Sequence, residues 1–168
     1  MNDVGLLVLR LVTGGLMAGH GSQKLIGAFG GPGLKGTAGF MEAIGLQPGK
    51  YWGTAAALSE SSGLLTAVGF LHPLGPIGTL AAMTMGAVKA HGGKPIWATS
   101  GGAELAVVYF AAALALIFTG PGQYSLDRAF GIRLPRALVV VVAVVASVAV
   151  AYGIAQPKPE ALPDHGAA

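Results

Sequence analysis

Four polar side chains in this largely apolar chain could do chemistry, namely His20, Lys24, His91 and Glu104. An imidazole or a carboxylate can transfer a proton to a bound group, and a lysine ammonium can stabilise an anion that develops on it. Each residue also has a purely structural interpretation. Lys24 can extend its ammonium to a membrane surface, the histidines can be satisfied interfacial residues, and Glu104 can favour the start of a helix.

The composition indicates an integral membrane protein. Charged residues make up 10% of the chain and hydrophobic residues 53%, with a mean hydropathy of +0.66, whereas roughly a quarter of the residues in soluble domains are charged. Lysine and arginine are scattered between apolar blocks, so the lipid bilayer is the expected partner and nucleic acid is not. The chain has no cysteine, which excludes thiol chemistry on its own side chains, and no metal site is predicted.

Five apolar runs predict membrane-spanning helices, because each is close to the roughly 20 residues that cross a bilayer. Between the first two runs, the breakers GGPG and QPG leave room only for a short interfacial or re-entrant helix at about 29–50. The proline-rich end, residues 156–168, is expected to be disordered. The fold class is therefore all-α, a polytopic membrane helix bundle. The predicted spans are Val4 to Gly19, Tyr51 to Leu71, Leu74 to Ala90, Ala103 to Thr119 and Ala137 to Ile154.

Helices that alternate in direction bring the four candidate residues to one membrane face. The first helix ends near His20 and Lys24, the third ends near His91, and the fourth begins near Glu104. We therefore expect these side chains to line the mouth of a pocket that is apolar further down. Gln23 and Lys89 come to the same face, and the convergence of these six polar residues favours a shared function over separate structural roles.

Two further charges, Arg10 and Glu60, are expected to form a buried pair. Counted from His20 and from Tyr51, both lie roughly 13–15 Å below the same face at 1.5 Å per helical residue. An isolated charge near the middle of a bilayer costs at least ~2.5 kcal/mol. Pairing at matched depth would offset that cost, and the pair can be structural or functional.

The order and spacing of several short motifs resemble the DoxX family of small bacterial membrane proteins, which is related to the DoxD subunit of thiosulfate:quinone oxidoreductases. The motifs are Arg10, "HGSQKL" at His20, "SESSGLLTAVG" with Glu60, "AVKAHGG" with His91, and "GGAELAVVYFAAALALIFTGPGQYSLD". The resemblance covers Val4 to Asp127. It implies a four-helix membrane core over residues 1–127, to which 128–155 adds a loop and a fifth transmembrane helix.

The resemblance also implies a multi-pass protein of the bacterial inner membrane that belongs to a redox assembly. Such an assembly delivers electrons to the quinone pool or protects against oxidative and thiol stress together with soluble oxidoreductases. A pocket with polar groups at its mouth suits a quinone, whose reduction needs protons. Haem is not expected, since the two histidines lack supporting spacing.

Three functions remain open at this stage. The chain can be a subunit of a quinone-linked oxidoreductase, with or without catalysis of its own. It can instead be a non-catalytic membrane anchor for a soluble oxidoreductase, in which case His20 and His91 are dispensable for the partner. A small transporter is a third option, although five helices without an inverted repeat suit it poorly. A homo-oligomer is compatible with each of them.

Overall fold

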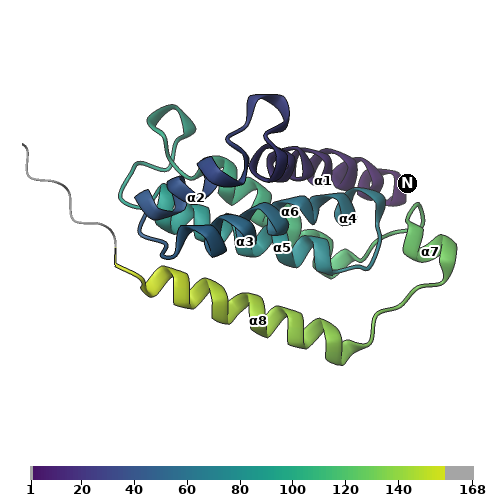
Figure 1. Ribbon diagram of the computed structural model, residues 1–168. Coiled ribbons are helices and arrows are strands. Elements are labelled where there is room, and N and C mark those ends of the chain that lie inside the picture. Colours follow the sequence, from purple (N-terminus) through teal and green to yellow (C-terminus); the bar gives the residue numbers. More distant parts are fainter. Residues whose placement is uncertain (1, 158–168) are drawn as a thin grey trace, which may run out of the picture.

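The computed structural model describes residues 2–157, and these form a helical bundle without any strand (Figure 1). The all-α prediction is therefore confirmed. From position 158 onward, the tail predicted to be disordered lies outside the described residues. The α-helices are α1 (Asn2–Ile26), α2 (Gly33–Ala43), α3 (Gly49–Ser61), α4 (Gly63–Val68), α5 (Leu74–Met85), α6 (Glu104–Thr119), α7 (Leu126–Phe130) and α8 (Arg136–Ala155), with 3-10 turns at Ala28–Gly30 and Ala98–Ser100 and a π-helical turn at Gly86–Ala90.

Helix length alone supports two of the five predicted spans. In the described part of the chain, Asp3–Ile26 and Arg136–Ala155 are long and apolar enough to cross a membrane, and α6 is apolar but shorter. The predicted span Tyr51 to Leu71 is divided into α3 and α4 at Ser62, whose hydroxyl donates a hydrogen bond to the Ser59 carbonyl at 2.6 Å. The α-helical part of the next predicted span ends at Met85, where the π-helical turn begins.

Glycines set the contact of α1 with α3 and α4. A Cβ atom on Gly14 would lie 2.5 Å from the Ala67 nitrogen and 2.6 Å from the Gly63 carbonyl oxygen. One on Gly63 would lie 2.6 Å from the Gly14 carbonyl oxygen. Real Cβ contacts are not this short, so the backbones touch directly and their register is fixed.

Replacing Gly14 with leucine should destabilise the bundle by about 1–3 kcal/mol, because α1 must move away from α4 to make room for the side chain. Gly15→Leu is the matched control, since no atom lies within 4 Å of a Cβ built there. Both variants gain the same helix propensity. Thermal unfolding in detergent, followed by circular dichroism, should show a lower midpoint only for Gly14→Leu, and equal midpoints would contradict the described contact.

The predicted interfacial segment contains α2, which packs against α3 and α1. The breakers found in the sequence bound it, with Pro32 before its first residue and the turn at Gly45, whose φ is 80°, after its last. The chain therefore turns back between α1 and α3, and α2 forms a cover beside the polar end of α1 (Figure 1).

The last helix, α8, runs along one side of the bundle and packs mainly against α5 (Figure 1). Its C-terminal end is fastened by Gln156, whose side chain accepts a hydrogen bond from the Gln47 nitrogen at 2.7 Å and donates one to the Gln47 carbonyl at 3.0 Å. The buried Lys89 donates to the Gln156 carbonyl at 2.7 Å. The rings of Trp52 and Tyr152 stack nearby with their centroids 6.2 Å apart.

Candidate functional site

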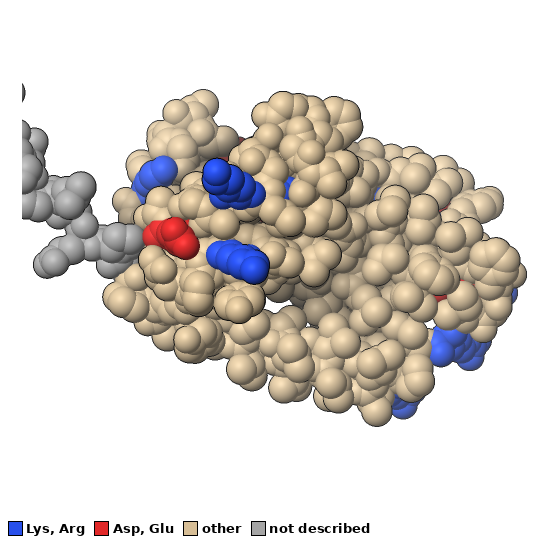
Figure 2. All heavy atoms as spheres, in the orientation of Figure 1, with Lys and Arg blue, Asp and Glu red and all other residues tan. Residues whose placement is uncertain are grey.

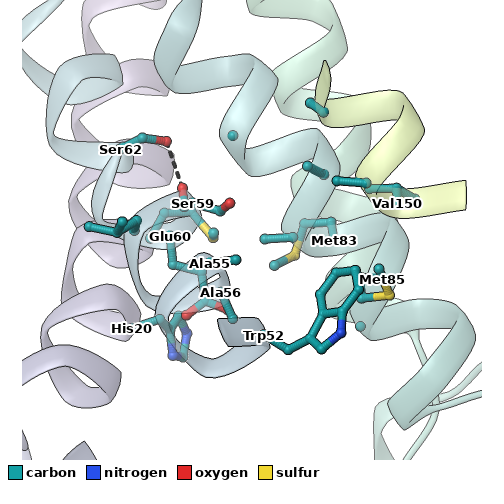
Figure 3. Close-up of a pocket in the computed structure, with 18 of the residues that line it drawn as sticks. His20, Trp52, Ala55, Ala56, Ser59, Glu60, Ser62, Met83, Met85 and Val150 are labelled. Carbon is teal, nitrogen blue, oxygen red and sulfur yellow. Dashed lines mark hydrogen bonds between the residues drawn. The ribbon is translucent and has the colours of Figure 1, made fainter. Parts of the chain in front are cut away.

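A cavity of about 710 Å³ lies between α8 and the rest of the bundle. Figure 2 shows the surface hollowed between the bundle and its lower edge, where α8 runs. The walls are mostly alanine, valine, methionine and leucine side chains from α3, α5, α6 and α8. Figure 3 shows His20 and Glu60 on one side of this space, opposite Met83 and Val150. The charged side chains and histidines that line it are His20, Lys24, Glu60 and His91, and the hydroxyls of Ser59, Ser62 and Tyr109 are further polar groups.

Lys24 and Glu60 form the ion pair of this cavity. The Lys24 Nζ atom lies 2.5 Å from Glu60 Oε2, and the two side chains are 22% and 10% exposed. The ammonium donates the hydrogen bond and the carboxylate accepts it. At such burial each charge needs the other, because an uncompensated partner would carry a desolvation cost of several kcal/mol.

The predicted pair of Arg10 with Glu60 is wrong. Gly21 lies against Ser61, so Glu60 is level with the turn of α1 that carries Lys24. Arg10 lies some 21 Å further along α1 at 1.5 Å per residue. It is level with Gly69. The depth estimate assumed that His20 and Tyr51 mark the same plane, whereas α1 continues to Ile26 and α3 already begins at Gly49.

Arg10 belongs to a second polar cluster at the opposite end of α1. Its side chain is buried, and its guanidinium donates to the Pro121 carbonyl and, at 2.6 Å, to the Tyr124 carbonyl. The buried Asp127 supplies a nearby opposite charge. Both oxygens of Asp127 accept backbone hydrogen bonds at 2.8 Å, from the nitrogens of Leu71 and His72. This cluster ties the turn between α4 and α5 to α7 and is structural.

No functional or structural role was predicted for Asp127 from its sequence context. Its hydrogen-bond donors are the backbone nitrogens of residues 71 and 72, more than fifty positions away. No pattern of side chains in the sequence predicts hydrogen bonds to these nitrogens. The available signal was local. Ser125 precedes it as the N-cap of α7, accepting a hydrogen bond from the Arg128 nitrogen at 3.2 Å.

The two histidines at the cavity each use one ring nitrogen within the protein. His20 Nδ1 lies 3.2 Å from Gln23 Oε1, and His91 Nδ1 lies 2.7 Å from the Gly101 carbonyl oxygen. Because both partners are acceptors, Nδ1 carries the proton in each ring. In a neutral ring Nε2 is then an acceptor, available to a bound molecule or to a proton.

Glu104 is placed apart from the other three candidates. It is not among the residues that line the cavity. Its carboxylate accepts a hydrogen bond from the Ala98 nitrogen at 2.8 Å, and its own nitrogen donates to the Ile96 carbonyl at 2.9 Å. Glu104 thus begins α6 and holds the loop before it. The structure brings His20, Lys24 and His91 together around one space and adds Glu60 to them.

Tyr109 is a cavity residue that was not predicted from the sequence. The Tyr109 hydroxyl makes no hydrogen bond with any residue from 2 to 157. It can therefore donate to a bound molecule. In the sequence it sits within the apolar run "ELAVVYFAAALALIFT", where nothing separates a cavity tyrosine from one that faces lipid.

A comparison with known families decides the identity of the chain. The sequence profile of DoxX matches residues 5–92. This chain belongs to the DoxX family. It is therefore a membrane protein of that family, and the resemblance inferred from the motifs is confirmed. The match includes His20, Lys24, Glu60 and His91, whereas Tyr109 and the cavity wall on α8 lie beyond it. No curated protein and no solved structure matches the chain.

His72, in the turn between α4 and α5, has a depressed pKa. Burial is the largest cause and lowers the pKa. A hydrogen bond to the Ile117 backbone and the charge of Asp127 act in the opposite direction, while Arg10 lowers the pKa further. The folded protein therefore holds this ring neutral more strongly than the unfolded chain does, and its contribution to stability is present above the ordinary value of 6.5 and lost as the pH falls below it.

Replacing His72 with glutamine should flatten the loss of stability between about pH 7 and pH 5, because the group that takes up a proton on unfolding is removed. The measurement is the thermal midpoint in detergent across this pH range. His20→Gln is the control, since that ring is exposed, and it should leave the profile unchanged. A profile for His72→Gln that parallels the unsubstituted protein would refute the assignment.

Proposed function

We propose that this DoxX-family protein binds a lipid-soluble quinone in the cavity beside α8 and acts as a subunit of a quinone-linked membrane oxidoreductase. The observation that carries the proposal is the Lys24–Glu60 ion pair on the wall of an apolar cavity of about 710 Å³. Cavities of roughly 300–1,000 Å³ with a few convergent polar groups are typical small-molecule sites. Here the polar groups would hold a polar head and the apolar walls a hydrophobic tail.

The length of the cavity supports a ligand with a tail. Its lining residues run from Leu74 to Met85 on α5 and from Val141 to Val150 on α8. These stretches correspond to about 13–17 Å at 1.5 Å per residue, or about half of the ~30 Å hydrocarbon core of a bilayer. The cavity wall on α8 includes Val141 and Val145, which are 56% and 62% exposed. In the proposal, a hydrophobic molecule enters the cavity sideways from the lipid past these residues.

The chemistry of the lining suits proton transfer to a quinone carbonyl. A bound quinone would take up two electrons and two protons. In the proposal, Lys24 donates a hydrogen bond to the carbonyl oxygen and stabilises the negative charge that reduction places there. Glu60 is placed to relay protons to the head group, and Nε2 of His20 to collect them from the exposed end.

We assign electron delivery to a soluble oxidoreductase that docks at the same end of the bundle. Exposed lysines lie at this end, among them Lys35 on α2 and Lys50 on α3, and Figure 2 shows basic side chains outnumbering acidic ones there. Such a surface favours an acidic partner. The proposal also includes a bacterial inner-membrane location with α1, α3–α4, α5, α6 and α8 as membrane crossings. Its support is the family match together with the two helices of sufficient length.

Removing both charges of the ion pair should weaken quinone binding at least tenfold without unfolding the protein. Lys24→Met/Glu60→Met leaves no uncompensated charge, and replacing a buried ion pair with apolar side chains is often neutral for stability. Trp52 lines the cavity, so in a Trp97→Phe background its fluorescence should be quenched by decyl-ubiquinone. We expect at least a tenfold weaker Kd for the double variant, since charge-assisted hydrogen bonds contribute roughly 1.5–3 kcal/mol.

Lys50→Met is the control, because Lys50 is exposed and does not line the cavity. Its Kd should stay within about twofold of the parent value. Thermal midpoints of all variants establish that each is folded. If the folded parent protein binds no quinone, the redox proposal is overturned, and the chain is better treated as a membrane anchor for its soluble partner.

A further inference from the structure

A second cavity, of about 540 Å³, lies at the opposite end of the bundle. It is formed by the start of α1, the turn after α4, the loop after α6 and the chain that joins α7 to α8. No candidate from the sequence analysis belongs to it. Its charged and polar lining consists of Asp3, His72, Gln123, Asp127, Arg128 and Arg133.

The two carboxylates of this cavity are committed to the protein backbone. Both oxygens of Asp127 accept hydrogen bonds from residues 71 and 72, and the Asp127 carbonyl accepts one from the Ile132 nitrogen at 2.8 Å. Asp3 Oδ1 accepts one from the Gln123 nitrogen at 2.9 Å. Both carboxylates are therefore held by backbone nitrogens, and the positive charge of Arg10 acts on Asp127 from nearby.

The guanidinium groups of the two arginines in this cavity, in contrast, are not engaged by the described part of the chain. The guanidinium groups of Arg128 and Arg133 make no hydrogen bond or ion pair with any residue from 2 to 157. Both residues are exposed, and Arg136 follows at the first position of α8. Figure 2 shows this positive group at the lower right, around α7 and the beginning of α8. Two free guanidiniums at the rim of one cavity suit a phosphate group, which each can bind through paired hydrogen bonds.

The surroundings indicate which molecule carries that phosphate. The cavity lies where α1 and α8 begin and α6 ends, which is the level of lipid headgroups if these helices cross the membrane. Beside the arginines, α7 exposes Phe130, at 70%, and Leu126, at 39%. Charged donors next to exposed apolar side chains match a phospholipid, whose headgroup and acyl chains need both. We propose that this cavity binds the phosphate of an anionic phospholipid through Arg128 and Arg133.

The bound lipid would hold the free end of α8. The C-terminal end of this helix is fastened by Gln156 and by the stacking of Tyr152 on Trp52. Its other end is joined to α7 by residues 131–135, which include Arg133. A headgroup held by both arginines fixes this linker and with it the position of α8. The proposal does not depend on what the first cavity binds.

Native mass spectrometry of the detergent-solubilised protein tests the proposal. Titration with phosphatidylglycerol should show one tightly bound lipid, with phosphatidylcholine at least tenfold weaker. Arg128→Gln/Arg133→Gln should weaken phosphatidylglycerol binding at least tenfold. Lys50→Gln/Lys94→Gln removes the same charge from exposed residues at the other end and should change binding less than twofold. Thermal midpoints verify that both double variants are folded.

Two results would overturn the assignment. Equal binding of phosphatidylglycerol to the two double variants would mean that the arginines do not form the site. Tight binding of inorganic phosphate that is lost with the arginines, without a preference for phosphatidylglycerol over phosphatidylcholine, would assign the cavity to free phosphate instead of a lipid. A phosphatidylglycerol preference that only the arginine substitutions remove supports the proposal.

Discussion

The direct backbone contact of α1 with α3 and α4 is the constraint on which the site depends. Gly14 and Gly63 let the two segments touch, and Gly21 does the same against Ser61. These contacts fix how far α1 can slide along its neighbour. Sliding by one turn would move Lys24 about 5.4 Å from its position opposite Glu60. Both charges would then lose their partner in a largely apolar environment, so the glycine contacts and the ion pair reinforce one register.

Helix positions and the polar end of the bundle could be predicted from the sequence, but the pairing of charges could not. Hydropathy alone places a helix in each of the five runs, and alternation of direction brings His20, Lys24 and His91 to one end. The depth of Arg10 and Glu60 in the bundle could not be predicted in this way, because it was counted from assumed membrane boundaries. About four helical turns separate Arg10 from Lys24, the true partner of Glu60. The glycine contacts show which levels of the helices coincide, and the sequence does not.

The sequence also did not indicate which side chains bind backbone atoms or which face of α8 lines the cavity. The Asp127 carboxylate accepts its hydrogen bonds from backbone N–H groups, which every residue except proline has. The residue types at positions 71 and 72 therefore do not indicate this contact. Helix α8 was predicted as a fifth transmembrane helix. Its valine-rich run has no periodicity that separates faces, although Val141, Val145 and Ala149 line the cavity while Val144 and Val148 do not.

The positive charges at the two ends of α1 are compensated in different ways. At one end Lys24 is neutralised by a single side chain that also faces the cavity, so a bound molecule can compete for it. At the other, Arg10 is held by two carbonyls next to a carboxylate whose own oxygens are both occupied. A charge whose partners are backbone atoms of rigid turns cannot respond to a ligand, whereas a side-chain pair can. The exchangeable pair, and not the buried arginine, is therefore the part of α1 suited to chemistry.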